Sequence, residues 1–99
     1  MSDFRLAVDS ETGLCRASGE LGFVTAADAH AQLKRCLSAG GRVNIDCSAL
    51  ERIDSAGLAV LLDTVALARE QGVELRYAAL PAGVLRLARL SGVEALLPV

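Results

Sequence analysis

Polar and apolar positions alternate with a period of two in several short runs of the chain. Because successive side chains of a strand point to opposite faces, this rhythm predicts β-strands. The predicted strands cover residues 4–8, 14–17, 43–47 and 74–80. Residues 18–23 contain two glycines and are interpreted as a turn or an irregular strand end, and residues 96–99 as a last short strand or a packed tail.

Apolar residues recur three and four positions apart in three longer runs, which is typical of helices that bury one face. These predicted helices extend from Ala26 to Leu37, from Leu58 to Ala68, and from Pro81 to Leu90. Strands and helices in this order indicate an α/β layered fold, with right-handed crossovers wherever neighbouring strands are parallel.

The sequence of the central helix, residues 58–68, predicts two different faces. Leu58, Leu61, Leu62 and Val65 follow the spacing of a buried stripe. On an ideal helical wheel, Val60, Thr64 and Leu67 fall on the opposite side, which we expect to face water. Apolar residues on such a face are typical of a contact surface for another protein.

The segment before this helix is predicted to be a connection, residues 48–53, that Leu50 and Ile53 hold against the core. It delivers Asp54 and Ser55 to the edge of the sheet. A hydroxyl at a helix start lies among backbone N–H groups that lack intrahelical partners. Ser55 is therefore either a site for a phosphate or part of an ordinary helix cap.

Size and composition fit one domain, residues 1–99, since 99 residues leave no room for two. Hydrophobic residues make up 53% of the chain, but no apolar run approaches the roughly 20 residues that span a bilayer. The first ten residues lack the basic start and continuous apolar segment of a signal peptide, so we expect a cytoplasmic protein with no direct membrane insertion.

Charge and cysteine content narrow the possible ligands. The net charge of -2, with acidic and basic residues interspersed, argues against nucleic acid as a partner. Cys15, Cys36 and Cys47 are widely spaced without a C-x-x-C pair, and we interpret them as small buried residues rather than metal ligands.

No catalytic arrangement is complete. Ser55 lacks one of the two glycines of a nucleophile elbow, and His30, the single histidine, has no evident partner. Asp46 and Asp54 are a possible acid/base or metal pair if they lie at the same end of the sheet, but helix capping is the commoner role of such residues. We therefore expect a protein that is not an enzyme and has no cofactor and no metal.

Gly57 points to a close contact near this turn. A glycine inside a helix costs about 0.5–1 kcal/mol relative to alanine. Its presence predicts that another backbone, or a partner, approaches the helix start closely.

The pattern D-x-S-x-L-x-x-I-D-S-x-G-L, which begins at Asp46 and ends at Leu58, resembles the signature of STAS domains, the fold of anti-sigma factor antagonists. The resemblance implies a single STAS-type domain with a mixed four- to five-stranded sheet and about three helices packed mainly on one face. It makes Ser55 the regulated hydroxyl, with acidic neighbours Asp46 and Asp54. Gly57 and Leu58 then begin the helix that contacts partners. The position after the serine is often a small hydroxyl residue in this family but is Ala56 here, which weakens recognition by a kinase.

Residues 18–21 and 87–93, together with the Ala/Leu-rich central helix, are similar to the MlaB-type STAS subunits of Mla phospholipid ABC transporters. This similarity implies a protein-interaction module that binds the transporter ATPase. The expected partner-binding residues are Asp46, Asp54, Ser55, Ala56, Gly57, Leu58, Val60, Thr64 and Leu67. Two alternatives stay open: an anti-sigma factor antagonist that is released from an anti-sigma factor kinase when Ser55 is phosphorylated, and a nucleotide or small-anion sensor that uses the helix start.

Overall fold

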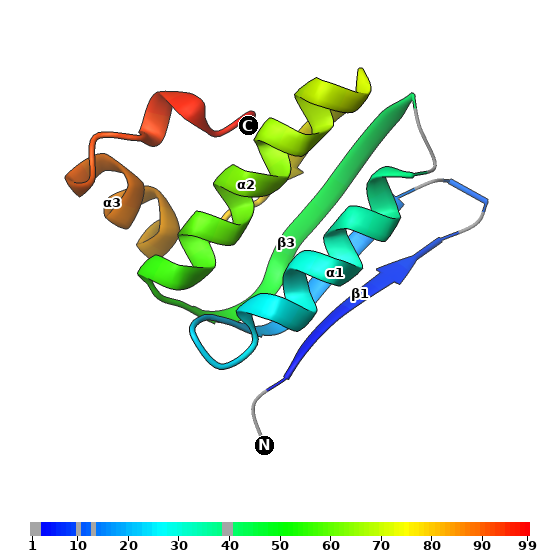
Figure 1. Cartoon of the computed structure of the whole chain (residues 1–99). Helices are drawn as coiled ribbons and strands as arrows, with labels where there is room; N and C mark the ends of the chain where they lie inside the picture. Colours follow the sequence, from blue (N-terminus) through cyan, green and yellow to red (C-terminus); the bar gives the residue numbers. More distant parts are fainter. Residues whose placement is uncertain (1–2, 10, 13, 39–40) are drawn as a thin grey trace.

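A four-stranded mixed sheet with the strand order β1-β2-β3-β4 forms one layer of the protein. The computed structural model describes residues 3–9, 11–12, 14–38 and 41–99. In chain order the elements are β1 (Phe4–Val8), β2 (Leu14–Leu21), α1 (Ala26–Leu37), β3 (Arg42–Ile53), α2 (Ser55–Gln71), β4 (Glu74–Ala78), α3 (Ala82–Leu90) and a short 3-10 helix, η1 (Glu94–Leu96) (Figure 1).

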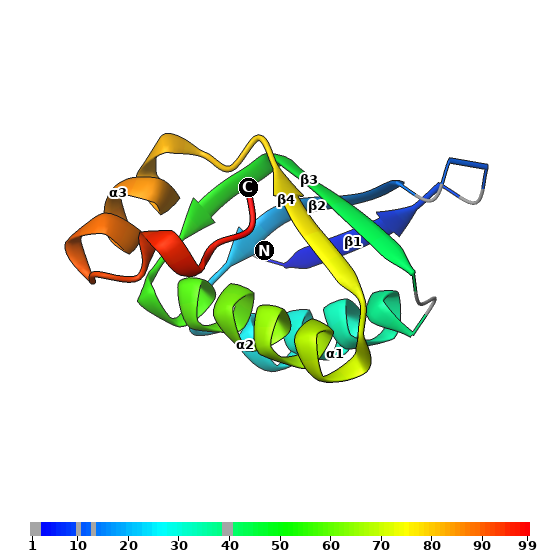
Figure 2. The same ribbon diagram turned by 90° about the horizontal axis from the view of Figure 1, so that it is seen from above.

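The helices form the second layer. β1 and β2 are antiparallel, whereas β2, β3 and β4 are parallel to one another, so α1 and α2 are the crossovers that parallel neighbours require. Both crossover helices cover the same face of the sheet, and α3 lies beyond the strand ends next to α2 (Figure 2). The predicted α/β fold, with a mixed sheet and three helices mainly on one face, is confirmed.

β3 is longer than the sequence pattern predicts. It continues past Cys47 and pairs with β2 as far as Ile53, so the prediction that residues 48–53 form a connection is wrong. The register between the two strands shifts after Arg16 and again after Gly19. These irregularities change which side chains face the helices, and Leu50 becomes buried after two exposed residues.

The C-terminal segment is a packed tail. Within the described ranges the sheet has four strands, and residues 97–99 do not add a fifth. Leu97 is buried, and the carbonyl of Pro98 accepts a 2.8 Å hydrogen bond from the N–H of Tyr77 on β4. Among all the residues that the structure describes, no helix is long and apolar enough to cross a bilayer.

Aliphatic side chains and three buried thiols fill the space between the sheet and the helices. Burial raises the pKa of Cys36 and of Cys47 to about 12, so both thiols stay neutral and pack as small apolar groups. The hydroxyl of Tyr77 donates a 2.7 Å hydrogen bond to the Leu61 carbonyl, which joins β4 to the middle of α2. The interpretation of the cysteines as buried residues is confirmed.

Candidate functional site

The turn between β3 and α2 is built around one carboxylate. Asp54 has an extended backbone and caps α2, and its Oδ1 accepts a 3.0 Å hydrogen bond from the N–H of Gly57. Its Oδ2 accepts a 3.1 Å hydrogen bond from the N–H of Phe23, in the loop between β2 and α1. The N–H groups of Gly57 and Phe23 hold the pKa of Asp54 below its usual range. Asp54 thus fastens two segments that are 31 residues apart in sequence.

Two glycines allow these segments to approach. A Cβ added to Gly57 would collide with the backbone carbonyl of Leu21 at the end of β2. One added to Gly22 would lie 2.7 Å from Oδ2 of Asp54. The close contact that Gly57 predicts is therefore with another backbone of this chain, and it needs no partner to explain it.

The loop from Gly22 to Thr25 is fixed by its own hydrogen bonds. The Thr25 hydroxyl donates to the Glu20 carbonyl at 2.9 Å and accepts from the Gly22 N–H at 3.0 Å. The N–H of Thr25 donates to the Gly22 carbonyl at 3.1 Å. With the bond from Phe23 to Asp54, these contacts hold the loop in one arrangement.

This fixed loop presents two apolar side chains to solvent. Phe23 and Val24 are each 83% exposed, which leaves them among the most exposed large apolar residues of the described chain. A surface hollow of about 230 Å³ lies beside them, lined by residues 20–25 and 52–54. The sequence offers one signal for them, namely two consecutive large apolar residues between the predicted elements. Phe23 falls within residues 18–23, which were interpreted only as a turn or an irregular strand end.

The prediction of a wet face on α2 is wrong. Val60 and Thr64 are 6% and 1% exposed, and Leu67 is half-buried. α2 rests on the sheet between α1 and α3 (Figure 1), so its buried arc is wider than the single stripe that a helical wheel assumes. The Thr64 hydroxyl is satisfied within the helix by donating to the Val60 carbonyl at 2.8 Å.

The exposed side of α2 carries short side chains over its first three turns. Ser55, Ala59, Asp63 and Ala66 are exposed at spacings of four, four and three, and Leu62 is half-buried beside them. Gly57 and the side chain of Leu58 are buried, so both residues support the turn from inside.

Asp46 belongs to a different part of the molecule. It lies in the middle of β3, where its Oδ1 accepts a 2.9 Å bond from the Ser48 N–H and its Oδ2 lies 3.6 Å from Nε of Arg16. The Ser48 N–H is the main cause that lowers the pKa of Asp46. The hypothesis that Asp46 and Asp54 form a pair at one end of the sheet is therefore wrong. Of the predicted site, the structure brings Asp54, Ser55 and Ala56 together at the surface.

An anion site at the start of α2 is disfavoured by the same geometry. The carboxylate of Asp54 already accepts the Gly57 N–H and carries a negative charge at the place that an anion would occupy. A phosphate or nucleotide would have to displace it or approach against its charge.

Two solved structures share this architecture. One is the structure of the anti-sigma factor antagonist SpoIIAA in its unphosphorylated form, with 17% identity and a TM-score of 0.69 over 95% of this chain and 84% of that chain. The other is murine Slc26a9, an anion transporter in the inward-facing state, with 14% identity and a TM-score of 0.70. That match covers 94% of this chain and 19% of the transporter chain. At these identities the likeness shows a shared fold, that of the STAS domain.

Residues 4–98 match the family model described as "Mlab, STAS domain", so the chain belongs to the MlaB-type STAS domain family. STAS domains are protein-interaction modules. Among curated proteins, none matches the chain. The resemblance that the D-x-S-x-L-x-x-I-D-S-x-G-L pattern predicts is thus confirmed at the level of the family and the fold.

Proposed function

We propose that this chain is a non-enzymatic docking subunit that binds the ATPase of an ABC-type phospholipid transporter. Membership of the MlaB-type STAS family supports an interaction role. The observation that carries the proposal is the rigid apolar tip, Phe23 and Val24, beside the exposed Ser55. Because such an ATPase works in the cytoplasm, the proposal places the chain there.

We define the docking surface as Phe23, Val24, Ser55, Ala56 and Ala59. Interfaces are commonly anchored by a few large apolar residues that enter pockets of the partner. The loop that carries Phe23 and Val24 is already fixed by four hydrogen bonds, so little conformational entropy is lost when these side chains are buried. The small residues at the start of α2 allow a partner helix or loop to approach closely.

The test measures the affinity of the purified chain for the purified ATPase of an Mla-type phospholipid ABC transporter by titration calorimetry. Changing Phe23 and Val24 together to serine removes two anchors, each worth about 1.5–3 kcal/mol when fully buried. We expect the affinity to fall at least about tenfold while the thermal unfolding temperature stays nearly constant.

Val8→Ser is the matched control. Val8 is also an exposed apolar residue, 60% exposed, but it pairs with Cys15 at the opposite end of β2 from the loop. Binding should be unchanged in this variant. Equal affinities for the wild-type chain and the Phe23/Val24 double variant would rule out this docking surface.

A second candidate function is an anti-sigma factor antagonist whose partner is released when Ser55 is phosphorylated. It is favoured by one observation, the exposure of Ser55 as the first residue of α2 in a fold shared with SpoIIAA. A phosphate at Ser55 would add about two negative charges next to the Asp54 carboxylate and the apolar tip. The charge would oppose burial of this surface against a partner far more than the helix dipole would favour it.

Ser55→Asp and Ser55→Ala separate this candidate from the first. Partner switching requires that Ser55→Asp abolish binding to an anti-sigma factor kinase, that Ser55→Ala retain it, and that mass spectrometry detect phosphate on Ser55 after incubation with that kinase and ATP. Ser48→Asp, an exposed serine in β3, controls for added charge elsewhere. Binding to the kinase that Ser55→Asp does not weaken would eliminate the switch.

A further inference from the structure

β1 is an outer strand of the sheet, and its free edge faces α1. Its partner β2 lies on one side only, with Phe4 opposite Gly19 and Val8 opposite Cys15. An outer strand normally offers unpaired N–H and C=O groups, to which a strand of another molecule can add.

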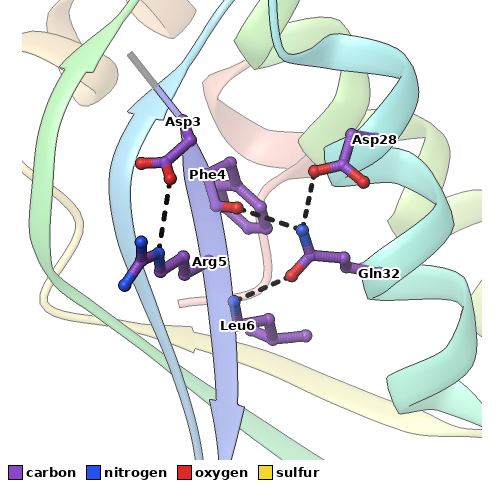
Figure 3. Close-up of polar contacts among 6 residues, drawn as sticks. All are labelled: Asp3, Phe4, Arg5, Leu6, Asp28 and Gln32. Carbon is purple, nitrogen blue, oxygen red and sulfur yellow. Dashed lines mark hydrogen bonds and ion pairs between the residues drawn. The ribbon is translucent and has the colours of Figure 1, made fainter. Parts of the chain in front are cut away.

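Here the side-chain amide of Gln32, on α1, occupies that edge. Figure 3 shows its Oε1 accepting a hydrogen bond from the N–H of Leu6 at 2.9 Å and its Nε2 donating to the carbonyl of Phe4 at 3.0 Å. The same Nε2 donates to Oδ2 of Asp28, one helical turn earlier, at 2.8 Å. Asp28 therefore fixes which way the amide of Gln32 points.

The pattern of these two bonds is that of a parallel strand. In a parallel ladder, one residue accepts from the N–H of the residue after its partner and donates to the carbonyl of the residue before it. Phe4 and Leu6 flank Arg5 in this way, and the amide of Gln32 has the same donor and acceptor as one peptide unit. A single side chain thus replaces one residue of a fifth strand.

The edge that Gln32 covers is otherwise suited to pairing with a copy of itself. In an antiparallel pair centred on Leu6, each Leu6 would lie opposite the other, and each Phe4 opposite a Val8. These three side chains all lie on one face of β1, so the contact on that face would be apolar. Val8 is already 60% exposed beside a hollow of about 200 Å³ that Leu6, Gln32 and Cys36 help to line.

We propose that Gln32 closes the β1 edge and so prevents the chain from forming a two-fold dimer with a second copy through β1. On the opposite side of the sheet, the Pro98 carbonyl accepts the outward N–H of Tyr77 and covers part of the β4 edge. Both outer strands thus have part of their free edge already hydrogen-bonded within the chain. Partners are therefore directed to other surfaces.

Gln32→Ala tests the proposal, with Gln71→Ala as the matched control because Gln71 is an exposed glutamine at the end of α2. Amide hydrogen exchange in dilute samples should show the Leu6 N–H exchanging about tenfold faster in Gln32→Ala, since it loses its acceptor. The Arg5 and Ala7 amides, on the β2 side, should keep their rates. In sedimentation experiments over rising concentration, Gln32→Ala should form dimers to a greater extent than the wild-type chain and Gln71→Ala.

Adding Val8→Lys to Gln32→Ala should return the chain to the wild-type association state, because a charged edge residue opposes strand pairing. If Gln32→Ala does not fold, Gln32→Glu replaces it. This variant keeps the acceptor for Leu6 but loses the donor for Phe4 and faces the Asp28 carboxylate. An unchanged Leu6 exchange rate in Gln32→Ala would overturn the proposal, and so would association of either folded variant no greater than that of the wild-type chain.

Discussion

Asp54 joins the start of α2 to the loop that carries Phe23, so Asp54→Ala should loosen both at once. The loss of a helix cap costs about 1 kcal/mol. The bond to the Phe23 N–H is a second, charge-assisted hydrogen bond, and its removal costs about another 1 kcal/mol at this exposed position. We therefore expect the free energy of unfolding to fall by about 2 kcal/mol, and the midpoint of thermal unfolding to fall by roughly 8–16 °C.

The loss should depend on pH in a definite direction. Because the pKa of Asp54 is lowered in the folded protein, the unfolded chain takes up the proton first as the pH falls. The stabilisation by Asp54 is complete above the ordinary carboxylate pKa of about 3.9 and is lost as the pH falls through the lower folded value. The difference between the wild-type chain and Asp54→Ala should therefore shrink below about pH 4.

Urea unfolding at pH 7 and at pH 3.5 measures both effects, with Asp46→Ala as the control. Asp46 also accepts a backbone N–H and also has a lowered pKa, but it connects only neighbouring residues of β3 and a surface arginine. Its replacement should cost clearly less. If Asp54→Ala were no less stable than Asp46→Ala at pH 7, the conclusion that Asp54 joins the loop to the start of α2 would be refuted.

Three further substitutions test a close contact, a buried hydrogen bond and a strained backbone position. Gly57→Ala should destabilise the fold by about 1–3 kcal/mol in urea unfolding, because the added methyl group collides with the Leu21 carbonyl; a gain in stability from better helix propensity would show that the contact is loose. Tyr77→Phe should cost about 0.5–1.5 kcal/mol by loss of the bond to Leu61, and an unchanged unfolding midpoint would contradict this. Ala79 has a positive φ of 56°, so Ala79→Gly should raise stability by about 1 kcal/mol in calorimetry, unless a lower midpoint shows that this backbone is unstrained.

The sequence predicts the elements of this fold well where one rhythm runs without interruption. α1 begins at Ala26 and ends at Leu37, as the spacing of its apolar residues indicates. β3 was predicted too short because residues 48–49 break the alternation before Leu50 restores it. That break coincides with a register shift against β2, a property of two strands together that the pattern of one strand does not contain.

The candidate site was predicted in part for a similar reason. The motif locates the start of α2 at Ser55 and its cap at Asp54, since both depend on residues close in sequence. The exposed tip at Phe23 and the edge cap at Gln32 depend on bonds between residues 31 and 26 positions apart. The spacing of residues along the chain does not predict such hydrogen bonds, because one side-chain amide or carboxylate can bond to many different backbone groups.

The burial of Val60 and Thr64 changes where a partner is able to bind. A helix at the edge of a layer buries one stripe, whereas α2 has the sheet beneath it and a helix on either side. The apolar residues on its flanks are therefore buried within the chain and are not available to a partner. The two most exposed large apolar side chains of the described residues, Phe23 and Val24, lie instead in the loop at the end of β2. That loop is held against the helix start by the same carboxylate that caps α2. The proposed docking surface and the helix cap therefore both depend on Asp54. Substitutions of Phe23 and Val24, rather than of Asp54, are the ones that test binding separately from folding.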